Sequence, residues 1–234
     1  MPLYKIADVP VEMSPRFEDT ASWYEPYLCK EDIEPQISIT ATDEEIDYFL
    51  TEGEGFTHGT AENTVFTDKF NRRLLKFDGS YIHSSALLFD DKVYLISGSS
   101  GVGKSTLTTR WCRMYPDRTE VINDDKPSFR LIDDKCIIYG TPFAGGTCKQ
   151  LNKSAELGAI VFLEQAATDT LRKLSTPEAI SLLLEQTPGR LTPKIADKLL
   201  SMYSDILTHY PVYKLSCTDS DNAVTTAMNI IKQI

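Results

Sequence analysis

A chain of 234 residues with 41% hydrophobic and 25% charged residues is long enough for one large core, or for a main core and a smaller one. Its formal net charge of −10, with lysine and arginine scattered along the chain, argues against nucleic-acid binding, because a phosphate backbone requires a cationic face. We expect neither a signal peptide nor a membrane span, since no stretch combines the required length and apolar character. The five widely spaced cysteines predict reduced thiols and a cytoplasmic location.

Residues 1–78 are predicted to form a small α+β unit. Strand-like pieces at residues 4–6 and 36–40 alternate with turns marked by four prolines, Pro10, Pro15, Pro26 and Pro35. Thr42 opens a capping box, Thr-Asp-Glu-Glu, that begins a helix running to residue 50. A second helix is expected over residues 63–77. No catalytic constellation is evident in this unit, so we expect it to recognise a substrate or a partner.

Residues 79–234 are predicted to form a larger α/β domain with a mixed sheet and flanking helices. Two apolar runs, 81–89 and 92–97, meet at a pair of aspartates and predict a β-hairpin. Further along the chain we expect a helix at 106–115, a strand at 119–122, a hairpin at 128–139, and strands at 157–163 and 212–215. Three more helices are expected at 176–185, 193–208 and 219–233.

The strongest motif lies between the first hairpin and the first helix of this domain. Residues 98–105 read Gly-Ser-Ser-Gly-Val-Gly-Lys-Ser and match the phosphate-binding pattern G-x-x-x-x-G-K-[ST]. The glycines let backbone N–H groups turn toward phosphate oxygens, Lys104 would reach the β- and γ-phosphates, and Ser105 would ligate Mg²⁺. The loop also precedes a helix, whose N-terminus favours an anion. We therefore predict that ATP binds at Gly98, Ser99, Ser100, Gly101, Val102, Gly103, Lys104, Ser105 and Thr106.

Three further residues are candidates for catalysis. Asp124 and Asp125 follow the strand predicted at 119–122, and ligands in open α/β sheets gather at such strand ends. One carboxylate could hold Mg²⁺ while the other accepts a proton from an attacking hydroxyl. Both can serve only if the strand has ended, because neighbouring side chains on a strand point to opposite faces. The alternative is that the two aspartates form a solvated turn without a function. His83, on the strand before the loop strand, is either a packing residue or a contact to the transferred phosphate.

Three segments resemble the catalytic domain of the HPr kinase/phosphorylase family, whose wider relatives are the ATP-dependent PEP carboxykinases. They are Ile-His-Ser-Ser at 82–85, the loop at 97–105, and Ile-Asn-Asp-Asp-Lys at 122–126, and the resemblance covers about residues 80–165. It implies that Lys104 and Ser105 bind phosphate and Mg²⁺ and that Asp124 lies near the metal. It also implies that Asp125 is the base, that His83 contacts the phosphate at the site of transfer, and that the chain can form a homo-oligomer.

One segment departs from the family pattern. Residues 138–143 read Ile-Tyr-Gly-Thr-Pro-Phe where HPr kinases carry a metal-ligating glutamate, which argues against HPr as the acceptor. We predict an ATP-dependent kinase that transfers the γ-phosphate to a hydroxyl, above all a serine, of a protein, peptide or small molecule. Arg190, before a predicted helix, is either a phosphate-facing arginine or a surface residue. The alternatives are a kinase for a small metabolite and an ATP-binding regulatory module with slow hydrolysis.

Overall fold

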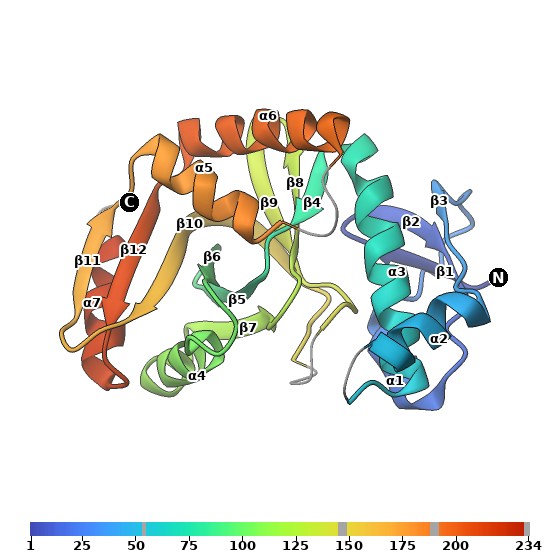
Figure 1. Ribbon diagram of the computed structural model, residues 1–234, viewed down its shortest axis with the longest axis horizontal. Coiled ribbons are helices and arrows are strands. Elements are labelled where there is room, and N and C mark those ends of the chain that lie inside the picture. The colour runs from blue at the N-terminus through green and yellow to red at the C-terminus, as the bar shows by residue number, and fades with distance from the viewer. Residues whose placement is uncertain (53–54, 145–148, 188–191, 232–234) are drawn as a thin grey trace.

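The computed structural model describes residues 1–52, 55–144, 149–187 and 192–231 (Figure 1). In this part of the chain a mixed sheet of nine strands runs through the larger part of the molecule. Its strands are β4 (Gly79–Tyr81), β5 (Ser84–Phe89), β6 (Lys92–Ser97), β7 (Thr119–Asn123), β8 (Ser128–Ile132), β9 (Lys135–Tyr139), β10 (Ser154–Gln165), β11 (Thr170–Lys173) and β12 (Val212–Cys217). The sheet is curled, and helices flank it as the sequence predicts.

The strand directions bring several carboxyl ends to one edge of the sheet. Strand β10 pairs in parallel with both β6 and β12, while β5 pairs antiparallel with β6 as the predicted hairpin. Strand β7 pairs antiparallel with β5 and therefore runs in the direction of β6. The ends of β6, β7, β10 and β12 consequently lie at the same edge, which is where open α/β sheets bind their ligands.

Four helices cover the two faces of this sheet: α4 (Lys104–Met114), α5 (Thr176–Glu185), α6 (Pro193–His209) and α7 (Asp221–Ile231). Alternation along β6 assigns the faces, because Val93 and Leu95 pack in one buried cluster with α5 and α6. Tyr94 and Ile96 pack in the other cluster, with α4 and α7. None of the helices in the described ranges has both the length and the apolar character needed to cross a membrane.

The N-terminal residues form a smaller unit beside the sheet. It contains a three-stranded sheet, helices and two 3-10 turns: β1 (Leu3–Ile6), β2 (Val9–Glu12), β3 (Ile37–Ser38), α1 (Glu18–Tyr24), α2 (Asp43–Glu52), α3 (His58–Leu74), and the turns Glu25–Tyr27 and Leu75–Phe77. Its buried cluster also includes Tyr139 and Phe143 from the larger part of the chain, so the two parts share a core. The division into two domains at residue 78 stays a prediction.

Several sequence-based expectations were wrong in detail. Pro10 lies inside β2 rather than in a turn; it is tolerated because β3 pairs only from Val11 onward, so the missing N–H interrupts no ladder. Helix α3 begins at His58, not at residue 63, because Thr57 forms a capping box with Thr60. His83 stands just before β5, and helix α1 and strand β11 were not predicted at all.

Candidate active site

The glycine-rich segment at residues 98–105, here called the glycine loop, connects the end of β6 to the start of α4. Gly98, Gly101 and Gly103 have φ angles of +139°, +75° and +109°, which L side chains rarely adopt. A Cβ atom on Gly98 would also lie 3.0 Å from the carbonyl oxygen of Leu163. The loop leads directly into the first turn of α4, whose N–H groups lack partners within the helix and carry partial positive charge. This conformation therefore depends on its glycines and presents a site suited to an anion.

Lys104 closes over the glycine loop. Its Nζ donates hydrogen bonds to the carbonyl oxygens of Gly98 (3.0 Å) and Ser99 (3.1 Å). Burial lowers the pKa of Lys104, and the nearby carboxylates of Asp125 and Asp124 oppose that shift. The ammonium group is thus held against the loop by two backbone carbonyl oxygens. A bound anion could take the place of these oxygens as its hydrogen-bond partner.

Ser105 and Asp124 form a pair of oxygen ligands beside the loop. The Ser105 hydroxyl donates to Oδ1 of Asp124 at 3.1 Å, and Asp124 is only 9% exposed. Its other carboxylate oxygen, Oδ2, is buried with no hydrogen-bond partner among the described residues. A buried carboxylate oxygen without a partner is costly, and oxygen ligands suit Mg²⁺, so these two side chains fit that ion. Among the described residues no group of three or more His, Cys, Asp or Glu side chains is placed to hold a metal ion, so further ligands would come from substrate and water.

Asn123 ends β7, and its side chain holds the turn that follows Asp124. Its Oδ1 accepts hydrogen bonds from the backbone N–H groups of Asp125 (3.0 Å) and Lys126 (2.8 Å). Its Nδ2 donates to the carbonyl and hydroxyl oxygens of Thr141, at 3.0 and 3.2 Å. Asn123 and Thr141 are both fully buried. The strand has therefore ended where the carboxylates begin, which is the condition for both of them to serve one site.

We expect Asn123→Ala to destabilise the protein by about 3 kcal/mol, since it removes four hydrogen bonds and leaves buried partners unsatisfied. Urea unfolding would measure this change. Asn152→Ala is the matched control, because that exposed side chain makes one hydrogen bond, to the carbonyl of Pro26, and should cost less than about 1 kcal/mol. Equal stability of the two variants would show that Asn123 does not hold this turn.

Asp125 contacts His83, whereas Asp124 contacts Ser105. Oδ1 of Asp125 lies 3.3 Å from Nε2 of His83, and Oδ2 lies 3.3 Å from Nζ of Lys126. Burial raises the pKa of Asp125, but the hydrogen bond from His83 and the charge of Lys126 outweigh it, so the pKa lies below its ordinary value. The carboxylate is therefore held in its ionised form, the form that can accept a proton.

Gln186, at the end of α5, is a site residue that sequence reasoning missed. Its Oε1 lies 3.2 Å from Nδ1 of His83, and its carbonyl oxygen accepts the backbone N–H of His83 at 3.2 Å. The imidazole therefore lies between Gln186 on one side and Asp125 on the other. No local pattern could have indicated this residue, because 103 positions separate it from His83 in the sequence.

The structure brings the predicted catalytic residues to one edge of the sheet. His83 is tied to this edge by the Ser97 hydroxyl, which donates to the His83 carbonyl at 2.8 Å. A groove of 510 Å³ runs along the glycine loop, past the end of β10, to Gln186. Thr106 is exposed on the first turn of α4. Arg190 lies outside the described residues.

Comparison with known proteins leaves the family open. No family model matches this chain, and no curated protein matches it. Among solved structures it is similar to the HPr(Ser) kinase/phosphatase from Coxiella burnetii, with a TM-score of 0.40 and 13% sequence identity. The alignment covers 66% of this chain and 97% of that one. The relationship is a distant structural one and does not establish family membership.

Proposed function

We propose that this protein is a phosphotransferase that moves the γ-phosphate of ATP to an alcohol hydroxyl, with serine as the favoured acceptor group. The observation that carries the proposal is the Ser105–Asp124 pair at the start of α4, with one buried carboxylate oxygen left without a partner. This pair lies beside a glycine loop of the phosphate-binding pattern, and the ionised Asp125, the next residue after Asp124, is close enough to act on the Lys104 ammonium. Phosphoryl transfer requires these elements: phosphate neutralisation, oxygen ligands for a metal, and a group that orients the nucleophile.

The glycine loop would hold the phosphates of the nucleotide. Lys104 would exchange its two carbonyl partners for phosphate oxygens and offset their charge. Ser105 and Asp124 would hold Mg²⁺, which when bound neutralises negative charge on the phosphates. Because the loop and the helix start are already formed, little reorganisation accompanies binding.

Asp125 would orient and deprotonate the acceptor. The hydroxyl proton passes to the Asp125 carboxylate as the hydroxyl oxygen forms a bond to the γ-phosphorus, and the bond from phosphorus to the bridging oxygen of ADP breaks. A carboxylate with a lowered pKa is a weak base at neutral pH, but the negative charge of the bound triphosphate raises that pKa. His83 would contact the transferred phosphate while Gln186 and Asp125 hold its ring.

In the free protein the pKa of Asp125 is expected to lie below the ordinary aspartate value of 3.8. Since folding lowers this pKa, the carboxylate stabilises the fold at pH above about 4, and the contribution is lost as the pH falls through the folded-state pKa. His83→Ala removes a hydrogen bond to the charged form and should raise the pKa. Carboxyl ¹³C NMR would follow the titration of Asp125 in the wild type and in His83→Ala. An unchanged pKa in the variant would contradict the inference that the hydrogen bond from His83 lowers the pKa of Asp125.

The direct test incubates the purified protein with γ-labelled ATP, Mg²⁺ and a panel of acceptors: free serine, serine-bearing peptides, HPr and a metabolite extract. We expect label to appear in one class of acceptor. Tight ATP binding with no labelled acceptor and only slow phosphate release would instead favour a nucleotide-binding regulatory module. Label on a free metabolite alone would identify a small-molecule kinase.

A further inference from the structure

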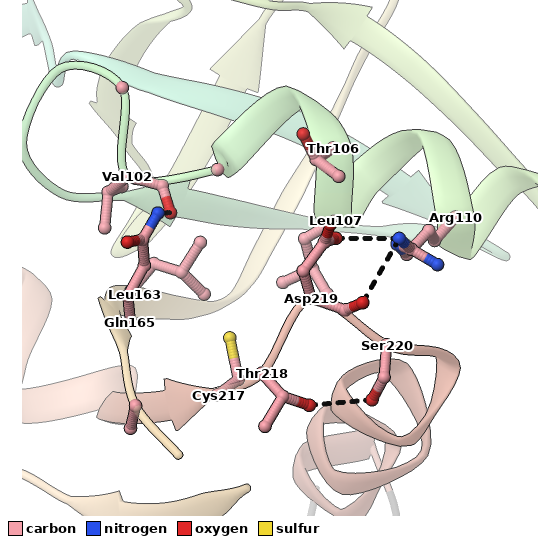
Figure 2. Close-up of a pocket in the computed structure, with 13 residues that line it drawn as sticks. Val102, Thr106, Leu107, Arg110, Leu163, Gln165, Cys217, Thr218, Asp219 and Ser220 are labelled. Atoms are coloured by element: carbon pink, nitrogen blue, oxygen red, sulfur yellow. Dashed lines mark hydrogen bonds and ion pairs between the residues drawn. The ribbon is translucent and has the colours of Figure 1, made fainter. Parts of the chain in front are cut away.

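The N-terminal unit carries a groove that is separate from the glycine loop. One cavity, between α4 and the start of α7, borders that loop, as Figure 2 shows. A different groove, of 290 Å³, lies between helices α2 and α3. We call it the α2–α3 groove, and the residues that line it are Glu44, Glu45, Tyr48 and Phe49 of α2 and Val65, Asp68 and Lys69 of α3.

The floor of the α2–α3 groove is apolar. Val65 is 4% exposed and packs in a buried cluster with Ile46 of α2, and Phe49 packs against this cluster. The Tyr48 ring meets the Phe49 ring edge-on, with the centroids 5.4 Å apart, although Tyr48 itself is 59% exposed. A partner that covers the Tyr48 ring would remove this apolar surface from water, which favours binding.

The rim of the α2–α3 groove is acidic. Five of the ten residues of α2 are acidic, and none is lysine or arginine. Lys69 is the one cation among the described residues that line the groove, and its Nζ donates to Oε2 of Glu45 and to the carbonyl of Thr40, both at 2.6 Å. Asp68 is paired with Arg72. Glu44 is exposed and has no hydrogen bond or ion pair with any described residue, so its carboxylate is open to a cation from a partner.

Volume and charge together define the kind of partner that fits the α2–α3 groove. Small-molecule sites usually have volumes of about 300–1,000 Å³, so this smaller groove suits one large side chain rather than a cofactor. The acidic rim attracts lysine or arginine beside that side chain and repels an acidic segment. A second copy of this chain is a poor partner, because each copy has a formal net charge of −10. The fitting occupant is a basic peptide segment with an aromatic or large aliphatic side chain.

The α2–α3 groove lies near the part of the active site that holds Asp125. Burial raises the pKa of Tyr81, and the charges of Asp125 and Asp68 raise it further, so both carboxylates lie near one phenol. Asp68 is also part of the groove lining. Phe70, on the same helix, meets Phe143 with the ring centroids 5.2 Å apart, which holds α3 against the larger part of the molecule.

We propose that the α2–α3 groove docks a basic segment, with one large apolar side chain, of the polypeptide that carries the acceptor serine; this inference rests on the phosphotransferase function proposed above. The large side chain would lie against Tyr48 and Val65, and the flanking basic residues would pair with Glu44. Docking near Asp125 raises the local concentration of the serine at the base. The acceptor is then a peptide or protein, since a free metabolite gains nothing from the groove.

Synthetic peptides test this assignment. The probe peptide joins the segment Lys-Lys-Phe-Lys-Lys through a glycine linker to a single serine; one control peptide has glycine in place of phenylalanine, and another has glutamine in place of every lysine. The groove variant combines Glu44→Gln with Tyr48→Ser. The matched control variant combines Glu34→Gln with Ile33→Ser, an acidic and an apolar residue of the same unit outside the lining. All four side chains are exposed, so thermal unfolding should be unchanged in both variants. Calorimetry would measure peptide binding, and γ-labelled ATP would give KM and kcat for the probe peptide.

We expect the wild type and the control variant to bind the probe peptide at least about tenfold more tightly than the groove variant does, and to bind both control peptides at least about tenfold more weakly than the probe. The groove variant should raise KM for the probe peptide by about tenfold with kcat unchanged. Equal binding of the probe peptide by all three proteins, or groove-dependent binding without an effect on KM, would overturn the docking proposal while transfer to other acceptors still supports a phosphotransferase. Absence of label from every acceptor, with peptide binding that still depends on the groove, would overturn the phosphotransferase function and with it the role in acceptor docking.

Discussion

Lys104→Ala is expected to lower phosphoryl transfer by at least about a hundredfold, because it removes the cation placed to offset charge that develops on the transferred phosphate. Binding of ATP should weaken as well, since the same ammonium neutralises phosphates in the ground state. The readouts are the single-turnover rate with γ-labelled ATP and the dissociation constant of a non-hydrolysable analogue. Lys92→Ala is the control: that lysine lies on the same strand that leads into the loop, but at its far end, paired with Glu156.

The fold should survive the Lys104 substitution. In the free protein the ammonium is partly buried against the carbonyl oxygens of Gly98 and Ser99, and burial lowers its pKa, so this position is not favourable for the charge. Removing the side chain returns those carbonyls to water. Thermal unfolding should therefore change little while activity is lost. Wild-type turnover in the variant would contradict the assignment of the glycine loop as a phosphate site.

The parts of the structure that the sequence predicts well are those with local causes. The glycine loop can adopt its three positive φ angles only with glycine at those positions, and the hairpin between β5 and β6 follows from two apolar runs around a short polar turn. Helix α5 has the predicted bounds because Ser175 and Glu178 form a capping box at its start.

The parts that the sequence does not predict depend on distant neighbours. Strand β10 is longer than its apolar run, because residues 154–156 pair with β9 whereas residues 160–165 pair with β12. Strand β11 is an edge strand whose side chains are nearly all exposed, so it lacks the alternation that indicates a strand. These features depend on pairing partners remote in sequence, and a local pattern carries no information about them.

The candidate site also has parts that the sequence predicts and parts that depend on distant neighbours. The pair Asp124 and Asp125 could be found from its place after a strand, and the sequence also showed that both could serve only if the strand had ended. The partner that each carboxylate faces could not be predicted, because Ser105 and His83 come to them from other elements. The turn that separates the two carboxylates depends on Thr141, which follows β9 and meets Asn123 only in the folded chain.

Asp125→Asn is expected to spare nucleotide binding and to lower transfer by about a hundredfold to ten-thousandfold, the usual contribution of a positioned general base. The amide keeps the shape of the carboxylate and an oxygen that can accept from His83, but it cannot take the proton of the acceptor. Calorimetry with the Mg²⁺-bound ATP analogue and single-turnover rates would separate the two effects. Asp91→Asn, in the exposed turn between β5 and β6, is the control for loss of a negative charge.

Asp124→Asn should behave differently, because that carboxylate faces Ser105 and not His83. We expect it to weaken binding of the Mg²⁺-bound analogue, and to weaken it less when Mg²⁺ is left out, since an amide is a poorer ligand for the ion than a carboxylate. If instead Asp125→Asn abolishes Mg²⁺-dependent binding and Asp124→Asn does not, the two roles are exchanged. The protein would then have its base beside the glycine loop, and His83 would orient a metal ligand, so the contrast between the two variants decides which carboxylate takes the proton.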